Sequence, residues 1–146
     1  AGPTVAAAVA DLDVTVVANP DYADGLSTSL RAGIAAVPAD CDGAVVLLAD
    51  MPGIDATAVD RLIDAFDPES GALVVVATAG GRRGNPVVWS RRFFAELATV
   101  TGDTGGRGLI ARDPAAVVEV EIGTAAALDL DTPEALAAAG GTIGPG

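Results

Sequence analysis

Residues 44–49 read Ala-Val-Val-Leu-Leu-Ala, and a carboxylate, Asp50, follows them directly. Two other runs have the same character, Val14–Ala18 and Ala72–Ala77. Short β-branched runs without polar alternation are typical of strands that are covered on both faces, as in a parallel sheet. The stretch from residue 44 therefore predicts a buried strand that ends with Asp50 at the rim of the sheet.

Helical patterns lie between these runs. Ser27–Val37 and Ala56–Phe66 each place apolar side chains on one stripe, and Asp55 is the expected N-cap of the second. A further helix is expected at Val5–Ala10. The alternation of strands and helices predicts right-handed βαβ units in one α/β domain with a doubly wound core and a mostly parallel sheet.

The second half of the chain has a different pattern. Residues 78–86 are rich in glycine and arginine, and we expect no regular element there. The elements expected after them are a strand at Pro86–Trp89, a helix at Arg91–Leu97, a helix at Arg107–Arg112, a strand at Val117–Ile122, a strand at Leu128–Asp131 and a helix at Glu134–Ala139. We expect residues 1–139 to form one domain and residues 140–146 a flexible tail.

Charge is unevenly distributed along the chain. Its 20 carboxylates and 8 arginines, with no lysine or histidine, give a net charge of −12. Six of the arginines lie between Arg82 and Arg112, a segment with a net charge of +4, while the rest of the chain carries −16. The overall charge disfavours a nucleic-acid partner, but the local positive excess indicates an anion site.

Residues that are rare or absent exclude other classes. The single cysteine, Cys41, cannot form an internal disulfide, which favours a reducing compartment, and we expect a cytoplasmic protein. No apolar run of about 18 residues is present, so we expect no membrane span. Without histidine or lysine, hydrolysis by a catalytic triad is not supported. Nucleotidyl transfer needs only a metal, positioning and positive charge, which suits these residues.

Polar segments follow the predicted strands and are expected to meet at one rim of the sheet. Asp50 at that rim could hold a hard cation through its carboxylate, or could simply belong to a turn. A second acidic pair, Asp129 and Asp131, ends another predicted strand, and spacing alone does not choose between them. Asp131 could equally be the N-cap of the last helix. Two carboxylates from different strand ends would suit a Mg²⁺-nucleotide site.

Three other segments are candidates for binding an anion. Ser29 and its neighbouring hydroxyl groups begin a predicted helix, where they could contact a nucleotide or cap the helix. Two Gly-Arg loops, at residues 80–86 and 102–108, combine close backbone approach with arginine, which binds phosphate through two parallel hydrogen bonds. Each loop could equally be a solvated turn.

Five motifs occur in order along the chain: GLSTSLRAG at 25–33, LADMP at 48–52, RGNPV at 83–87, GDTGGRGL at 102–109 and DLDTPE at 129–134. From about Asn19 to Leu136 they resemble the molybdenum cofactor cytidylyltransferases, within the MobA-like nucleotidyltransferases. The resemblance implies a Rossmann-like, three-layer αβα fold of the GT-A nucleotidyltransferase type. It also implies an enzyme that transfers CMP from CTP to molybdopterin and releases pyrophosphate.

The resemblance implies roles for particular residues. Asp50 would be the principal ligand and Asp131 the second ligand of a Mg²⁺ or Mn²⁺ ion beside the triphosphate. The residues implied to line the nucleotide pocket are Gly25 and Ser29, and those implied to face the acceptor phosphate are Arg83, Asn85 and Arg107. A molybdenum hydroxylase apoenzyme is the implied recipient of the product.

The chain departs from the family pattern at its start. The family begins with a strand and a Gly-rich loop, followed by a lysine, that together bind the triphosphate, and this chain has neither. We therefore expect either about 50 further residues upstream, the size of the missing βα unit, or a degenerate copy. We expect the 146 residues alone to be catalytically incomplete. The use of GTP or another acceptor, or a non-catalytic role in cofactor binding and delivery, stays open.

Overall fold

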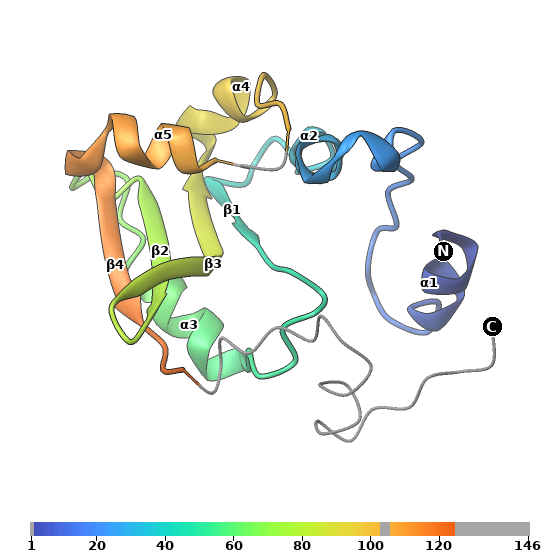
Figure 1. Cartoon of the computed structure of the whole chain (residues 1–146), viewed down its shortest axis with the longest axis horizontal. Coiled ribbons are helices and arrows are strands. Elements are labelled where there is room, and N and C mark those ends of the chain that lie inside the picture. Colours follow the sequence, from blue (N-terminus) through green and yellow to red (C-terminus); the bar gives the residue numbers. More distant parts are fainter. Residues whose placement is uncertain (1, 103–105, 125–146) are drawn as a thin grey trace.

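The computed structural model describes residues 2–102 and 106–124 (Figure 1). The helical elements in chain order are α1 (Gly2–Ala8), the 3-10 helix η1 (Tyr22–Asp24), α2 (Leu26–Ala35), α3 (Ala56–Asp64), the 3-10 helix η2 (Arg91–Phe93), α4 (Phe94–Leu97), α5 (Arg107–Arg112) and the 3-10 helix η3 (Pro114–Ala116). The strands are β1 (Gly43–Val46), β2 (Val74–Ala79), β3 (Arg82–Ser90) and β4 (Val117–Glu121). The elements expected at Leu128–Asp131 and Glu134–Ala139, and the expected tail, lie outside the described residues.

The four strands form one sheet in the order β1-β3-β2-β4. β3 is antiparallel to both of its neighbours, whereas β2 and β4 are parallel. The prediction of a mostly parallel sheet is therefore wrong for the described strands, although β1, β2 and β4 share one direction. The cause is a two-residue turn at Gly80 and Gly81, whose φ angles of 58° and 77° fold β3 back onto β2 as a hairpin.

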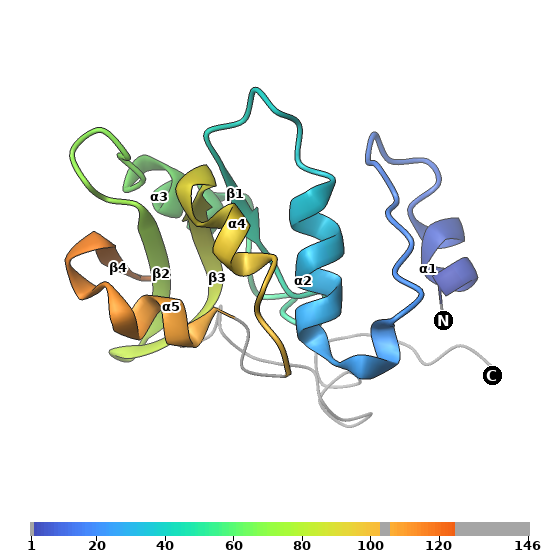
Figure 2. The same cartoon turned by 90° about the horizontal axis from the view of Figure 1, so that it is seen from above.

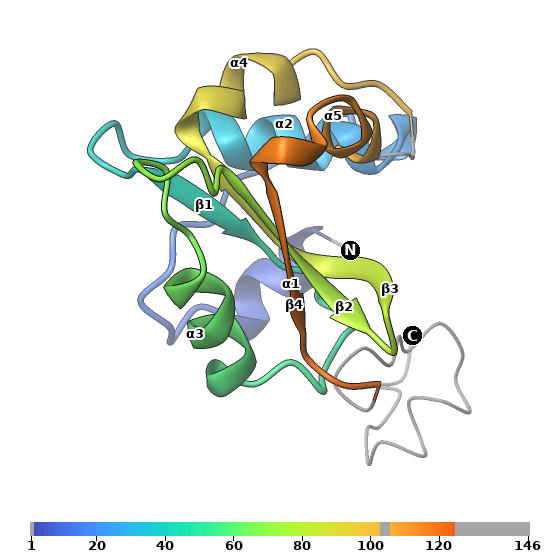
Figure 3. The same cartoon turned by 90° about the vertical axis from the view of Figure 1, so that its left-hand side faces the viewer.

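Helices cover both faces of the sheet (Figure 3). α2, α4 and α5 lie on one face and α3 lies on the other. Because successive side chains of a strand point to opposite faces, Val74 and Val76 pack with Ile34 and Ile110, while Val75 packs with Leu62 of α3. The prediction that residues 72–77 form a strand covered on both faces is confirmed over β2, whose first five residues are all buried.

The first predicted strand, Val14–Ala18, is wrong. These residues have no regular secondary structure, and Val14 and Val16 expose 56% and 57% of their surface. Figure 2 shows α1 and the chain that leads from it to α2 on the side of α2 that faces away from the sheet. An apolar run forms a strand only where a neighbouring strand offers hydrogen-bond partners, and no described strand lies against this one.

The remaining predictions concern helices and loop boundaries. The helices expected near α1, α2, α3, α4 and α5 are confirmed, and the Asp55 carboxylate accepts the N–H of Ala58 at 2.8 Å as the N-cap of α3. The expectation of an irregular segment at residues 78–86 is wrong, because Thr78 and Ala79 still belong to β2 and Arg82 already begins β3. In the part of the chain that the structure describes, no helix has the length and apolar character needed to cross a bilayer.

Candidate functional site

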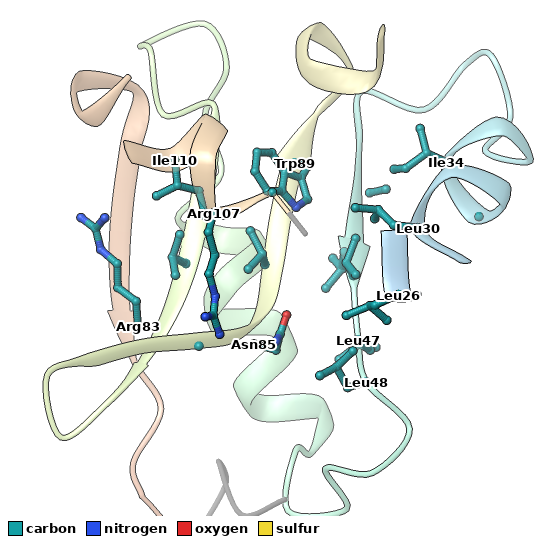
Figure 4. Close-up of a pocket in the computed structure, with 18 of the residues that line it drawn as sticks. Leu26, Leu30, Ile34, Leu47, Leu48, Arg83, Asn85, Trp89, Arg107 and Ile110 are labelled. Carbon is teal, nitrogen blue, oxygen red and sulfur yellow. The ribbon is translucent and has the colours of Figure 1, made fainter. Parts of the chain in front are cut away.

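Two adjoining cavities lie beside the sheet. The larger, of about 800 Å³, lies between α2, β1, β3 and α5, and side chains such as Leu30, Trp89 and Ile110 give it apolar walls (Figure 4). The smaller, of about 460 Å³, lies where β2 ends, beside the residues that follow β1 and β4. The wall common to both cavities consists of Leu48, Arg82, Arg83, Gly84, Asn85 and Arg107. The structure thus brings residues 82–85 of the first Gly-Arg segment and Arg107 of the second to one wall.

The charge of this wall is opposite to that of the protein. Arg82, Arg83 and Arg107 line both cavities, and no carboxylate is among the described residues that line either one. The whole chain carries a net charge of −12. Cavities that gather three guanidinium groups in an acidic protein attract an anion rather than a neutral or cationic molecule.

The three arginines differ in their partners. The Nε of Arg83 donates to Oε1 of Glu119 at 2.5 Å, in an ion pair whose side chains are 47% and 45% exposed. Neither the Arg82 nor the Arg107 side chain has a hydrogen-bond or ion-pair partner among residues 2–102 and 106–124. In Figure 4 the Arg107 side chain extends from α5 toward Asn85, whereas Arg83 points toward β4. Arg107 is therefore the better placed of these two side chains to receive a ligand anion.

A second carboxylate of β4 holds the turn of the hairpin. Glu121 accepts hydrogen bonds from the N–H groups of Gly80 and Gly81, at 2.8 and 3.2 Å, and from the hydroxyl of Thr78 at 2.9 Å. The Gly80 N–H, followed by that of Gly81 and by the Thr78 hydroxyl, lowers the pKa of Glu121 below its ordinary value of 4.5 because each stabilises the charged form. Glu121 therefore stays ionised and bound to the turn at neutral pH.

The prediction of a buried strand that runs through residues 44–49 and ends directly at Asp50 is wrong, because β1 ends at Val46 and is only half-buried. Asp50 lies in the turn that follows, and it is exposed. Its neighbours Leu48 and Met51 line the smaller cavity, but Asp50 itself lines neither. Asp129 and Asp131 lie outside the described residues, which contain no group of three or more acidic or cysteine side chains able to hold a metal ion. Mg²⁺ commonly uses one or two protein carboxylates together with phosphate oxygens and water. Asp50 is one exposed carboxylate of that kind, and its role as a metal ligand stays a prediction.

The start of α2 supplies the remaining candidates. Ser29 lines the larger cavity, whereas Gly25, the N-cap of α2 with a φ of 109°, does not. The side-chain amide of Asn19 donates to the hydroxyls of Thr28 and Ser29, at 2.8 and 2.9 Å. Asn19 therefore ties the incoming chain to the helix. Sequence reasoning missed this role, and the only signal was its position directly after an apolar run.

Comparison with known proteins places the chain in a family. A family model described as the MobA-like NTP transferase domain matches residues 1–117. No curated protein sequence matches the chain significantly.

Solved structures from mycobacteria are similar to the chain. The homologue of Mycobacterium tuberculosis Rv0371c from Mycobacterium sp. strain JC1 is 32% identical, with a TM-score of 0.65 over 76% of this chain and 55% of that one. Rv0371c of M. tuberculosis H37Rv in complex with manganese is 29% identical, with a TM-score of 0.63 over 75% of this chain and 58% of that one. A further structure of Rv0371c is 28% identical, with a TM-score of 0.71 over 95% and 73%.

The chain spans little more than half the length of the first two of these proteins. The family match, in contrast, covers most of the chain itself and includes β1, β2, β3 and α5, the elements around the two cavities. The chain therefore belongs to the MobA-like NTP transferase family, a family of nucleotidyltransferases.

Proposed function

We propose that this chain is the core of a nucleotidyltransferase that transfers CMP from CTP to molybdopterin and releases pyrophosphate. The observation that carries the proposal is the wall of three arginines, free of carboxylates among its described residues, in a protein with a net charge of −12. A nucleoside triphosphate and a phosphorylated acceptor are both strongly anionic, and both need such a wall. The choice of CTP and molybdopterin is supported by the five sequence motifs.

The residues of the chain suit a reaction that needs no protein base. A phosphate acceptor is already ionised at neutral pH, and the chain has no histidine or lysine to deprotonate one. An oxygen of the acceptor phosphate attacks the α-phosphorus of CTP, the bond from that phosphorus to the bridging oxygen of the β-phosphate breaks, and pyrophosphate leaves. Arg107 and Asn85 donate hydrogen bonds that hold and orient the acceptor, and Arg83 adds positive charge beside them. Ser29 lines the larger cavity and faces the nucleotide, and Gly25 lies four residues before it as the N-cap of α2.

A divalent cation belongs to this proposal. Asp50 would hold Mg²⁺ or Mn²⁺ with Asp131 as a second ligand, and a similar protein, Rv0371c, has been crystallised with manganese. When bound, the ion would neutralise part of the negative charge of the triphosphate. The same proposal includes a molybdenum hydroxylase apoenzyme as the recipient of the product, which rests on the motif resemblance. It also includes a cytoplasmic location, which rests on the single cysteine.

The test uses the natural full-length protein that contains these residues. We expect Mg²⁺-dependent release of pyrophosphate with molybdopterin and CTP, nearly abolished by Asp50→Asn. Asp64→Asn is the matched control, because Asp64 is an exposed carboxylate on α3, away from both cavities. Full activity of Asp50→Asn would overturn the metal assignment, and a preference for GTP in a panel of nucleotides would overturn the choice of CTP. Tight binding of CTP and molybdopterin without turnover would instead indicate a domain that binds and delivers the cofactor.

A further inference from the structure

β3, the arm of the hairpin that carries Arg82, Arg83 and Asn85, is held by a strand with which it does not pair. Among the described strands, β4 pairs with β2 only, and β3 lies on the other side of β2. Two side chains of β4 nevertheless reach the hairpin: Glu119 binds the guanidinium of Arg83, and Glu121 binds the turn at residues 80–81. Glu119 and Glu121 are two residues apart, so they project from the same face of the strand.

The turn resembles a small anion site that is already filled. Successive N–H groups in a tight turn form a concavity that binds anions, and here both N–H groups, of Gly80 and Gly81, donate to the Glu121 carboxylate. The same carboxylate also accepts from the Thr78 hydroxyl and from the N–H of Gly123 at 3.2 Å. The turn therefore has no free N–H donor to offer to a substrate phosphate.

We propose that Glu121 is a positioning residue: its carboxylate fills the anion position of the Gly80–Gly81 turn and thereby fixes Arg82, Arg83 and Asn85 in the wall between the two cavities. The inference rests on the proposed function, in which that wall binds an anionic substrate. The substrate anion then binds beside Arg107 and Asn85 and not in the turn, although the turn has the composition of a phosphate-binding loop.

A carboxylate is required at this position because every group that faces it is a donor. Glutamine has one acceptor oxygen and one NH₂ group, so Glu121→Gln turns a donor toward the N–H groups of the turn. Simple electrostatics predicts a different outcome, because loss of a negative charge near a cationic cavity should strengthen anion binding. Glu119→Gln is the matched control, since it removes the same charge from the same face of the same strand but breaks only the ion pair with Arg83.

The experiment measures binding of inorganic pyrophosphate by isothermal titration calorimetry in the wild type and both variants. We expect Glu121→Gln to raise the Kd about tenfold, equivalent to the loss of one hydrogen bond to a charged group. We expect Glu119→Gln to lower the Kd about two- to fivefold, because breaking an exposed ion pair releases Arg83 for the ligand. Hydrogen exchange should become faster at the amides of Gly80 and Gly81 in Glu121→Gln alone.

Each other outcome overturns a stated part of the inference. If both variants bind pyrophosphate more tightly, Glu121 acts only through its charge and positions nothing. Unchanged exchange at Gly80 and Gly81 would show that Glu121 does not hold the turn. In another outcome, the wild type binds no pyrophosphate while Glu121→Gln still speeds hydrogen exchange at Gly80 and Gly81. That result would overturn the proposed anion site, but it would support the role of Glu121 in holding the turn. Thr78→Val, which removes a single donor to Glu121, should raise the Kd less and in the same direction, and it replaces Glu121→Gln if that variant does not fold.

Discussion

Replacement of Gly106 by alanine should destabilise the protein, because the added methyl group would collide with Trp89. An ideal Cβ at Gly106 lies 2.2 Å from Cζ2 and 2.5 Å from Cη2 of the indole, whereas carbon atoms pack at about 3.5–4.0 Å. Trp89 is only 3% exposed and packs edge-on against Phe93, with the ring centroids 5.7 Å apart. Overfilling such a site costs about 1–3 kcal/mol of unfolding free energy, and each kcal/mol lowers the Tm by about 2–4 °C in a domain of this size.

The assay is urea unfolding followed by the fluorescence of Trp89, the only tryptophan in the chain. Gly108→Ala is the matched control, because Gly108 lies in α5, whose N-cap is Gly106, and an added Cβ at Gly108 meets no heavy atom within 4 Å. This control should stabilise the protein by about 0.5–1 kcal/mol, since alanine is the better helix former. The reasoning is refuted if Gly106→Ala is as stable as the wild type while Gly108→Ala shows its expected gain.

Two further predictions concern capping and pH. Removing the N-cap of α3 by Asp55→Ala should cost about 1 kcal/mol, measured by urea unfolding, and an unchanged midpoint would contradict the capping hydrogen bond. Hydrogen bonds from Ser70 lower the pKa of Asp67 below its ordinary value of 3.8. The pKa of Glu121 likewise lies below its ordinary value of 4.5. A depressed pKa in the folded state stabilises the protein above the unfolded pKa, and this contribution is lost as pH falls through the folded value. The Tm should therefore be constant near neutral pH and fall as the pH drops below about 4.5. In Glu121→Gln the Tm should fall less steeply with decreasing pH. If thermal melts give the same dependence of Tm on pH for both proteins, Glu121 makes no such contribution.

The helices could be predicted from the sequence because their signals are local. Asp55 and the apolar stripe of Ala56–Phe66 lie within a few residues of one another, and α3 begins where they indicate. The direction of β3 was missed, although Gly80 and Gly81 between two strand-forming runs are a recognised hairpin signal. The same two glycines also fit a ligand-binding loop, and the prediction of such a loop left out the hairpin.

The residues of the candidate site could be predicted only in part. Arg83 and Arg107 follow from their glycine-rich surroundings, and the structure brings both to one wall. The partner of Arg83 could not be predicted, because Glu119 lies 36 residues away and meets it only through the order of the strands. Alternation along β4 correctly predicts a solvated face for Glu119 and Glu121, but it does not show what their carboxylates bind.

The outer edge of β1 has a consequence for how the chain behaves among its own copies. β1 pairs only with β3 among the described strands, and the segment before α2 exposes three valines, Val14, Val16 and Val17. An open strand edge is a template on which a second copy can add a strand, and exposed apolar residues favour such association. The net charge of −12 opposes that step through repulsion between copies, and salt screens this repulsion. The net negative charge of the chain thus opposes aggregation, in addition to making the arginine wall a local exception in charge.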